Sequence, residues 1–471
     1  HEGFWWSPDG RTIAFQRTDV TGVEVLSISD PAHPERPPQT WPYPRPGKKN
    51  AEVTLGLIPA GGGKTTWVSW DRERYPYLAT VVWQENAPLT ILVQNRTQTE
   101  EALLAVDTLS GGTTPLLIEQ DAAWLNLMSG YPRWLKDGHA FLWMTERNGA
   151  PQLELRGRDG RLVRALTPPE PNLRDGVDLD EAHGAAWARG GEDPTQIHLI
   201  RVPLDPRRGR RAQVTSEPGI HGAVFSEDGS TYVHTLSPLS GPTRWWVRGR
   251  DGRVRGELRS VAETPSVTAR PEFTTVGDSL RFHAVLLRPR DFDPARRYPV
   301  IVSVYGGPGS QTVMASAQNY LTLQWLADHG FVVVSMDGRG TPARGRAWER
   351  ALKGDLIELP LRDQADALRA LGRRYPELEL TRVGITGWSF GAYVVTLALE
   401  RYPDVFHAGV AGAPVTDWLD YDTHYTERYM GLPDENRKGY EASSALTWAR
   451  DLSRPLLILH GTADDNVYFL H

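Results

Sequence analysis

The sequence predicts a multidomain protein with an all-β region over residues 1–258 and an α/β region over residues 259–471. Two observations predict this division. Up to about residue 258, short runs rich in Val, Ile, Thr and Trp alternate with Gly, Pro and Asp turns, and helical periodicity is scarce. After a connecting stretch near residues 259–275, short apolar runs alternate with helical segments, which is typical of a largely parallel sheet covered on both faces.

Two signatures recur in the all-β region. An aromatic residue stands shortly before Asp-Gly at residues 6–10, 134–138 and 225–229. Asp-Gly favours a hairpin turn that needs positive φ, and the aromatic residue suits the strand packing beneath that turn. Asp159, Asp205 and Asp251 are evenly spaced, with Asp107 at a slightly longer interval before them. A four-stranded repeat of about 40–50 residues is typical of a propeller blade. The pattern predicts about five blades of a β-propeller that is partial in this chain, with a β-sandwich as the alternative.

The composition limits the classes of partner. A formal net charge of -6 argues against a nucleic-acid-binding surface and against binding to an anionic membrane. No run of eighteen apolar residues occurs, so no membrane-spanning segment is predicted. The absence of cysteine excludes disulfides, thiolate metal sites and a cysteine nucleophile. The compartment stays open, with a periplasmic or exported location weakly favoured over a cytoplasmic one.

The two ends of the sequence indicate a piece of a longer polypeptide. Residue 1 is His rather than Met, and the aromatic string at residues 4–6 already continues into a strand. Residues 468–470, Tyr-Phe-Leu, resemble the beginning of a helix. We therefore expect missing residues at both ends, and any signal peptide or anchor would lie in the missing start.

The α/β region is organised around residues 383–393. A short aliphatic run precedes the string Gly-Trp-Ser-Phe-Gly at 387–391, and an apolar helical pattern follows over residues 392–401. This order of strand, sharp turn and helix is typical of the G-x-S-x-G nucleophile elbow of α/β-hydrolases. The glycines are needed because the strand and helix backbones nearly touch beside the serine. We predict Ser389 as the nucleophile and the amide of Phe390 as one oxyanion donor.

Further strands are predicted at the short apolar runs that surround the elbow, and one further helix lies before it. The predicted strands cover residues 280–287, 298–305, 331–336, 408–411 and 455–459, and the helix covers residues 361–374. Catalytic groups in such sheets gather at the carboxyl ends of strands. The elbow, residues 305–309 and residues 460–466 all follow such ends, so we expect these three stretches to form the site.

A serine nucleophile needs a histidine base, and that base needs an acid; the order in α/β-hydrolases is Ser, Asp, His. Asp464 is the predicted acid, with Asp465 as the alternative, and one of the two could cap the next helix. Only His471 follows Asp464, and it comes too early for the usual histidine loop, so we expect it at the surface. His460 and His407 are expected to pack. The triad histidine is therefore predicted to lie outside this chain.

The second oxyanion donor and the substrate pocket each leave alternatives open. The donor is either a backbone amide of Gly306-Gly307 or the hydroxyl of Tyr305, which could equally be an ordinary packing residue. Trp418, Tyr421 and Tyr425 recur at spacings of three and four, which predicts three rings on one helical face. These rings form either core or an apolar pocket beside Ser389.

Several long strings together resemble the dipeptidyl peptidase IV family of prolyl oligopeptidase-type serine peptidases. They are Gly-Trp-Ser-Phe-Gly, Tyr-Thr-Glu-Arg-Tyr-Met-Gly at 425–431 and His-Gly-Thr-Ala-Asp-Asp-Asn-Val at 460–467, with supporting strings at 4–10, 298–308 and 337–340. The resemblance is dense across roughly 280–471 and diffuse over the β region. The Trp before the serine is typical of this branch rather than of the prolyl endopeptidases.

The resemblance implies Ser389 as nucleophile, Asp464 as triad acid and Tyr305 as oxyanion donor. It also implies that Asn466 helps to hold the substrate carbonyl at P2. It implies an S1 pocket for proline or alanine, lined by Phe390, Val415, Trp418, Tyr421, Tyr425 and Val467. In relatives a Glu-Glu pair just before the Trp-Trp strand binds the substrate's amino terminus, and an upstream arginine assists; both would precede residue 1. Phe390 replaces the Tyr of many relatives, which leaves the backbone donor unchanged.

The expected function is release of Xaa-Pro, or Xaa-Ala, dipeptides from free peptide amino termini through an acyl-enzyme. No metal or organic cofactor is called for, and the resemblance implies a homodimer. The alternatives within the class are a prolyl tripeptidyl peptidase and an acylaminoacyl-peptidase or esterase. From another class, the alternative is an inactive scaffold that binds peptides or partners, although such relatives usually lose the elbow serine that this chain keeps.

Overall fold

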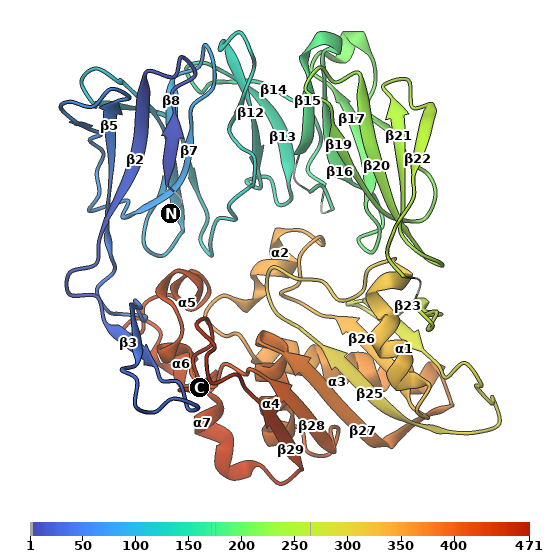
Figure 1. Ribbon diagram of the computed structural model, residues 1–471. Coiled ribbons are helices and arrows are strands. Elements are labelled where there is room, and N and C mark those ends of the chain that lie inside the picture. The colour runs from blue at the N-terminus through green and yellow to red at the C-terminus, as the bar shows by residue number, and fades with distance from the viewer. Residues whose placement is uncertain (1–2, 171, 175, 264) are drawn as a thin grey trace.

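The computed structural model describes residues 3–170, 172–174, 176–263 and 265–471, so His1, on which the expectation about the chain start rests, lies outside them. Over the described residues, five four-stranded sheets stand side by side in an arc above a seven-stranded mixed sheet (Figure 1). The predicted order of a β-propeller part followed by an α/β-hydrolase part is therefore confirmed.

Each of the five sheets is an antiparallel blade, and in the last four blades neighbouring strands follow one another along the chain. The first blade contains β1 (Phe4–Trp6), β2 (Thr12–Asp19), β5 (Glu52–Pro59) and β6 (Thr66–Trp67), and in this blade β2 pairs with β5. The second contains β7 (Tyr77–Val82), β8 (Leu89–Gln94), β9 (Glu100–Val106) and β10 (Thr113–Gln120). The third contains β11 (Arg133–Trp134), β12 (Ala140–Thr145), β13 (Gln152–Gly157) and β14 (Leu162–Ala165). The fourth contains β15 (Gly176–Asp180), β16 (Ala185–Gly190), β17 (His198–Pro203) and β18 (Ala212–Gln213), and the fifth β19 (Gly219–Phe225), β20 (Thr231–Pro238), β21 (Arg244–Gly249) and β22 (Val254–Leu258).

The repeated Asp residues occupy equivalent turns. Asp107, Asp159, Asp205 and Asp251 each lie between the third and fourth strands of their blades. Each accepts a backbone hydrogen bond from the residue two positions later, which stabilises the turn locally. The glycines of the predicted Asp-Gly turns adopt positive φ, for example +66° at Gly138, as Asp-Gly hairpins require.

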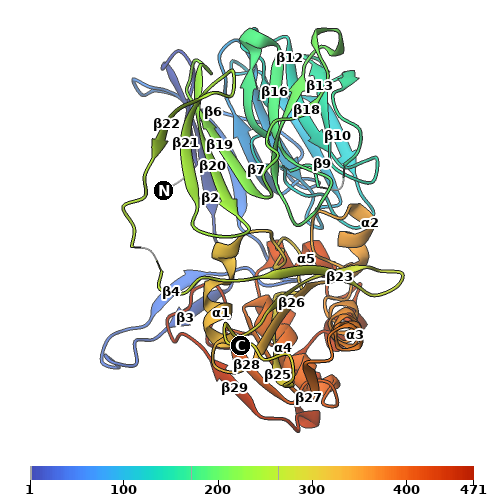
Figure 2. The same ribbon diagram turned by 90° about the vertical axis from the view of Figure 1, so that its right-hand side faces the viewer.

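A hairpin inserted into the first blade reaches from the propeller to the α/β domain. Strands β3 (Val25–Ile28) and β4 (Gln39–Pro42) pair only with each other and lie beside the lower domain (Figures 1 and 2). The segment after β4 is tied there by Arg45, which bonds both Glu24 at 2.8 Å and Asp420 at 2.5 Å. The first blade therefore contributes directly to the surroundings of residues 417–431.

The α/β domain is built on the strand order β23-β24-β26-β25-β27-β28-β29, in which the five strands from β26 to β29 run parallel. The strands are β23 (Glu272–Val276), β24 (Phe282–Leu287), β25 (Tyr298–Val304), β26 (Val332–Asp337), β27 (Leu378–Trp388), β28 (Ala408–Gly412) and β29 (Leu456–Leu459). The helices are α1 (Leu321–Ala327), α2 (Arg346–Glu349), α3 (Glu358–Arg374), α4 (Phe390–Arg401), α5 (Thr423–Met430), α6 (Arg437–Ala442) and α7 (Ala445–Trp448). None of the described helices is long and apolar enough to cross a membrane.

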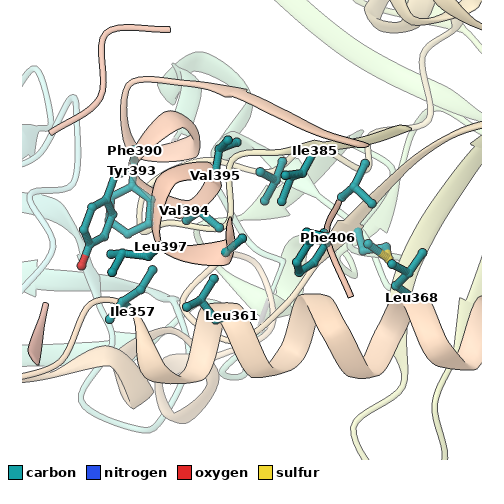
Figure 3. Close-up of a cluster of buried hydrophobic side chains, with 14 of the residues drawn as sticks. Ile357, Leu361, Leu368, Ile385, Phe390, Tyr393, Val394, Val395, Leu397 and Phe406 are labelled. Atoms are coloured by element: carbon teal, nitrogen blue, oxygen red, sulfur yellow. The ribbon is translucent and has the colours of Figure 1, made fainter. Parts of the chain in front are cut away.

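The core beneath the elbow is formed where α3 and α4 cover one face of this sheet. In Figure 3, Leu361 of α3 lies beneath Val394 and Leu397 of α4, and Leu368 lies beside Phe406. All five side chains are fully buried, and each contributes about 1.5–3 kcal/mol by leaving water. This packing holds the first turn of α4, and hence the elbow, rigidly on the sheet.

One propeller residue belongs to the same core. Trp124 is fully buried and its ring meets that of Tyr429 edge-on at 4.9 Å. Arg350 of the α/β domain donates from Nε to the Trp124 carbonyl at 2.8 Å and from its terminal nitrogen to Glu146 at 2.7 Å. The propeller is thus joined to the α/β domain by buried contacts as well as by the chain itself.

Candidate active site

Ser389 stands at a strained turn between β27 and α4. Its backbone has φ 55° and ψ -119°, which is unfavourable for any residue but glycine and costs about 1–3 kcal/mol. Two hydrogen bonds stabilise this backbone conformation: the Ser389 amide donates to the Gly412 carbonyl at 2.8 Å, and the Ser389 carbonyl accepts from the Tyr393 amide at 3.0 Å. The side chain is half-buried and therefore reachable at the sheet edge.

The two glycines of the elbow are required by contact distance. A Cβ on Gly391 would lie 2.2 Å from the Val304 carbonyl oxygen, and one on Gly387 would lie 2.5 Å from the Gly391 carbonyl carbon. Strand β25, the elbow and the first turn of α4 therefore touch through backbone atoms alone. This is the close approach that the sequence analysis predicted for the elbow.

The ends of four neighbouring parallel strands bring the predicted stretches together. Val304 pairs with Gly387, so Tyr305 leaves the sheet next to the elbow. On the other side, Trp388 pairs with Gly412, which pairs in turn with Leu459. The loop after Leu459 is thus two strand spacings, roughly 10 Å, from the strand that carries Ser389. That separation leaves room for an imidazole between a serine and an acid.

Asp464 lies in this loop with one carboxylate oxygen already engaged. Its Oδ1 accepts hydrogen bonds from the amides of Asn466 at 3.0 Å and Val467 at 2.9 Å. Its Oδ2 lies 3.9 Å from Nε2 of His460, which is too far for a hydrogen bond. Asp464 therefore has a fixed orientation and a free oxygen, whereas Asp465 is exposed to solvent.

Among the described residues, no histidine forms a hydrogen bond with Ser389 Oγ. His460 is buried and its Nε2 lies 2.8 Å from the Val467 carbonyl. His407 accepts from the Val383 amide at 3.2 Å through Nδ1. His471 was expected at the surface, but it is half-buried because it lies against Thr416 and Tyr421, and burial lowers its pKa to about 4.

Tyr305 and Phe390 lie together beside the serine. Their ring centroids are 5.8 Å apart, and burial raises the pKa of the Tyr305 hydroxyl above its ordinary value. That hydroxyl has no hydrogen-bond partner among the described residues, so it is free to donate to a ligand. Gly307 has a packing role, since a Cβ there would lie 2.4 Å from the Phe390 ring.

The predicted rings meet, but not on one helix. Trp418 is in the 3₁₀ turn Trp418–Asp420, Tyr421 is extended, and Tyr425 is on α5. The prediction of one helical face was wrong because Asp422 caps a new helix, accepting a hydrogen bond from the Tyr425 amide at 2.9 Å. The Trp418 and Tyr425 rings nevertheless stack at 5.7 Å, and Tyr421 meets Tyr425 edge-on at 5.4 Å.

The remaining predicted residues close this cluster. Phe390 lies 5.8 Å from the Trp418 ring, and Val415 and Val467 are buried in the same core. Asn466 accepts a hydrogen bond from the Tyr421 hydroxyl at 3.1 Å through its side-chain oxygen, which leaves its amide nitrogen available as a donor. Burial raises the pKa of Tyr421 to about 12, so its hydroxyl stays protonated as a donor at neutral pH.

Two residues near the cluster were missed by the sequence analysis. Tyr429 lies 4.8 Å from Tyr425, and its spacing of four residues from Tyr425 on α5 was a usable signal. Tyr43 comes from the hairpin segment and donates to the Asn466 carbonyl at 3.3 Å. No sequence signal connects residues so far apart. Within the described parts of the chain, no three His, Asp or Glu side chains are grouped so as to hold a metal ion.

Comparison with known proteins agrees with this geometry. The family model described as "Prolyl oligopeptidase family" matches residues 317–471, and that described as "Dipeptidyl peptidase IV (DPP IV) N-terminal region" matches residues 1–243. The chain belongs to the dipeptidyl peptidase IV family of serine peptidases. The resemblance seen in the sequence strings is therefore confirmed, including over the β region where it was diffuse.

Individual members of the dipeptidyl peptidase IV family align with the whole chain. Dipeptidyl peptidase 8 of Mus musculus is 27% identical, and the match covers 100% of this chain and 63% of the relative. The probable dipeptidyl-aminopeptidase B of Aspergillus oryzae is 30% identical over 98% of this chain and 56% of the relative. The crystal structure of Porphyromonas gingivalis dipeptidyl peptidase 4 superposes with a TM-score of 0.90 at 30% identity, covering 100% of this chain and 67% of that one. The chain thus spans less than two thirds of these two curated relatives.

Proposed function

We propose that the protein is a serine exopeptidase that releases Xaa-Pro, or Xaa-Ala, dipeptides from free peptide amino termini. The observation that carries this proposal is the strained Ser389 elbow, which adjoins a cluster of aromatic rings through Phe390. A nucleophile beside flat apolar walls suits a carbonyl that follows a small, flat side chain such as proline. The names of the relatives agree with cleavage of dipeptides.

The proposed reaction begins when Ser389 Oγ attacks the carbonyl carbon of the second substrate residue. The C–N bond breaks with transfer of the serine proton to the leaving amine, and water then hydrolyses the acyl-enzyme. The Phe390 amide and the Tyr305 hydroxyl would bind the developing oxyanion, and losing one such donor typically costs about 10²–10³ in kcat. The free hydroxyl of Tyr305 favours Tyr305 over the Gly306-Gly307 amides as the second donor.

The proposed base is a histidine outside these 471 residues, oriented by Oδ2 of Asp464. The free oxygen of Asp464 and the gap of roughly 10 Å between the two strand ends support this arrangement. His460 is a poor alternative because its Nε2 is bonded to the Val467 carbonyl. The 471-residue chain alone should therefore be inactive.

The proposed S1 pocket uses the rings of Trp418, Tyr421 and Tyr425 as walls, with the buried Val415 and Val467 beside them. Burial keeps the pKa of Tyr421 and of Tyr425 raised, so both hydroxyls stay neutral. A pocket without charge favours proline and alanine over charged residues at this position. The side-chain nitrogen of Asn466 would donate to the substrate carbonyl one residue earlier.

The proposal is tested with chromogenic Xaa-Pro dipeptide substrates and the full-length protein. Turnover is expected for the wild type and should be lost in Ser389→Ala; a Ser389→Ala variant as active as the wild type would refute the mechanism. An acetylated substrate should not be cleaved. Equal rates on free and acetylated substrates would instead indicate an acyl-peptidase or endopeptidase. Release of tripeptides would indicate a tripeptidyl peptidase. Binding of the peptide without turnover would indicate the inactive peptide-binding scaffold. Sedimentation analysis of the full-length protein tests the proposed homodimer.

A further inference from the structure

The turn between β8 and β9, residues 95–99, holds a strained residue far from the elbow. Gln98 has φ 56°, in the region that favours glycine, although its side chain is fully buried. Asn95 stabilises the turn from inside, accepting hydrogen bonds from the amides of Thr99 at 2.9 Å and Glu100 at 3.0 Å. A glutamine that persists in this conformation indicates that its side chain has a specific partner.

That partner is α5 of the other domain. Gln98 donates from Nε2 to the His424 carbonyl at 2.6 Å and accepts at Oε1 from Nε of Arg428 at 2.5 Å. Only one orientation of the amide satisfies both contacts, because a carbonyl can only accept and a guanidinium can only donate. His424 and Arg428 are one helical turn apart, so a single side chain spans that turn of α5.

A neighbouring ion pair joins the same turn to the same helix. Arg96 donates from Nε and a terminal nitrogen to the two carboxylate oxygens of Glu427, at 2.6 Å and 2.8 Å. Glu427 is fully buried, and it also accepts a hydrogen bond from the Gly47 amide at 2.7 Å. A paired guanidinium and carboxylate of this geometry fixes direction as well as distance.

The contacts with the propeller lie on one face of α5, and the ring of Tyr425 lies on the adjacent face. Residues 424, 427 and 428 recur at spacings of three and four and face the propeller, whereas Tyr425 faces Trp418. A rotation or slide of α5 would therefore move Tyr425. Two ring contacts from the propeller also reach α5: Tyr77 meets the His424 ring at 5.2 Å and Trp124 meets the Tyr429 ring at 4.9 Å. The contact from Gln318 Nε2 to the Gly241 carbonyl at 3.3 Å joins the two domains without involving this helix.

We propose that the 95–99 turn of the propeller positions the substrate pocket, with Gln98 and Arg96 as positioning residues that set α5 and hence Tyr425. This inference rests on the proposed function, because it assigns Tyr425 to the wall of the S1 pocket. Neither residue touches the reacting atoms. Their effect on the reaction passes through the placement of a ring, so it should appear as a change in selectivity for proline.

The test uses Gln98→Gly in the full-length protein, since glycine removes both contacts and suits φ 56° without strain. Gln98→Met, which keeps the volume, is a second variant, and Gln318→Ala is the control at the same domain interface. We expect kcat/KM on Xaa-Pro substrates to fall about tenfold or more in both Gln98 variants. Labelling of Ser389 by a small fluorophosphonate should change little, because that reaction does not use the pocket.

Hydrogen–deuterium exchange gives a readout that does not depend on the substrate. Amides of residues 423–430 should exchange faster in the Gln98 variants than in Gln318→Ala, while those of α4 stay unchanged. Unchanged exchange in α5, or a loss of fluorophosphonate labelling as large as the loss of turnover, would overturn the proposal. If the fluorophosphonate labels Ser389 of the wild type but the wild type does not cleave Xaa-Pro substrates, the proposed function is wrong. Hydrogen–deuterium exchange of the α5 amides then decides by itself whether the 95–99 turn holds the helix.

Discussion

Replacing Gly391 by alanine tests whether the elbow geometry controls catalysis. The new Cβ would lie 2.2 Å from the Val304 carbonyl oxygen and 3.2 Å from the Tyr305 Cα. The first contact is roughly 1 Å closer than a carbon and an oxygen normally approach, so β25 and the elbow must separate by about that much. Because both partners are backbone atoms, no side-chain rotation relieves the overlap.

The separation moves Ser389 away from Tyr305, and a displacement of about 1 Å can reduce kcat/KM by about 10²-fold. The overlap should also lower the free energy of unfolding by about 1–3 kcal/mol. Both quantities are measured on the full-length protein, with turnover of an Xaa-Pro substrate and a thermal melt. Gly384→Ala is the control, since it lies in the same strand and its Cβ would have no neighbour closer than 3.9 Å. Activity of Gly391→Ala within threefold of the control would refute the reasoning.

Three further predictions follow from individual contacts. Tyr305→Phe should lower kcat about 10²-fold or more with little change in KM, if its free hydroxyl binds the oxyanion; a change confined to KM in steady-state kinetics would contradict this. His221 and His234 are buried neutral with a mutual hydrogen bond of 2.8 Å, and burial lowers the pKa of His234 to about 4. The unfolded chain therefore takes up the proton first as the pH falls, so unfolding free energy measured in urea should be lost from about pH 6.5 down to about pH 4, by up to about 3 kcal/mol for His234. His234→Gln should show a shallower loss, and an identical pH profile would contradict the assignment. Arg96→Met leaves the buried Glu427 unpaired and should lower the free energy of unfolding by about 3 kcal/mol. Adding Glu427→Gln removes the unpaired charge, so the double variant should regain most of the lost stability. A double variant as unstable as Arg96→Met would argue against the ion pair.

Local sequence patterns were sufficient for the elements and for most of the candidate site. The Asp-Gly turns, the blade repeat and the elbow each depend on residues close in the chain, where φ preferences and close backbone contacts act. The gathering of Tyr305, Ser389 and Asp464 at one sheet edge was also predictable, because parallel strands end on the same side. The prediction of a single helical face for Trp418 and Tyr425 was wrong, because Asp422 caps a new helix between the two rings.

What the amino-acid sequence determined by itself was therefore the order of the two domains and the stretches that adjoin the serine. Only the tertiary structure decided which propeller residues reach the α/β domain, among them Trp124 against Tyr429, Arg96 against Glu427 and Gln98 against α5. These partners are hundreds of residues apart, and no periodicity or turn preference couples them. Their pairing depends on the burial of charge and ring surface that exists only after the domains have packed together.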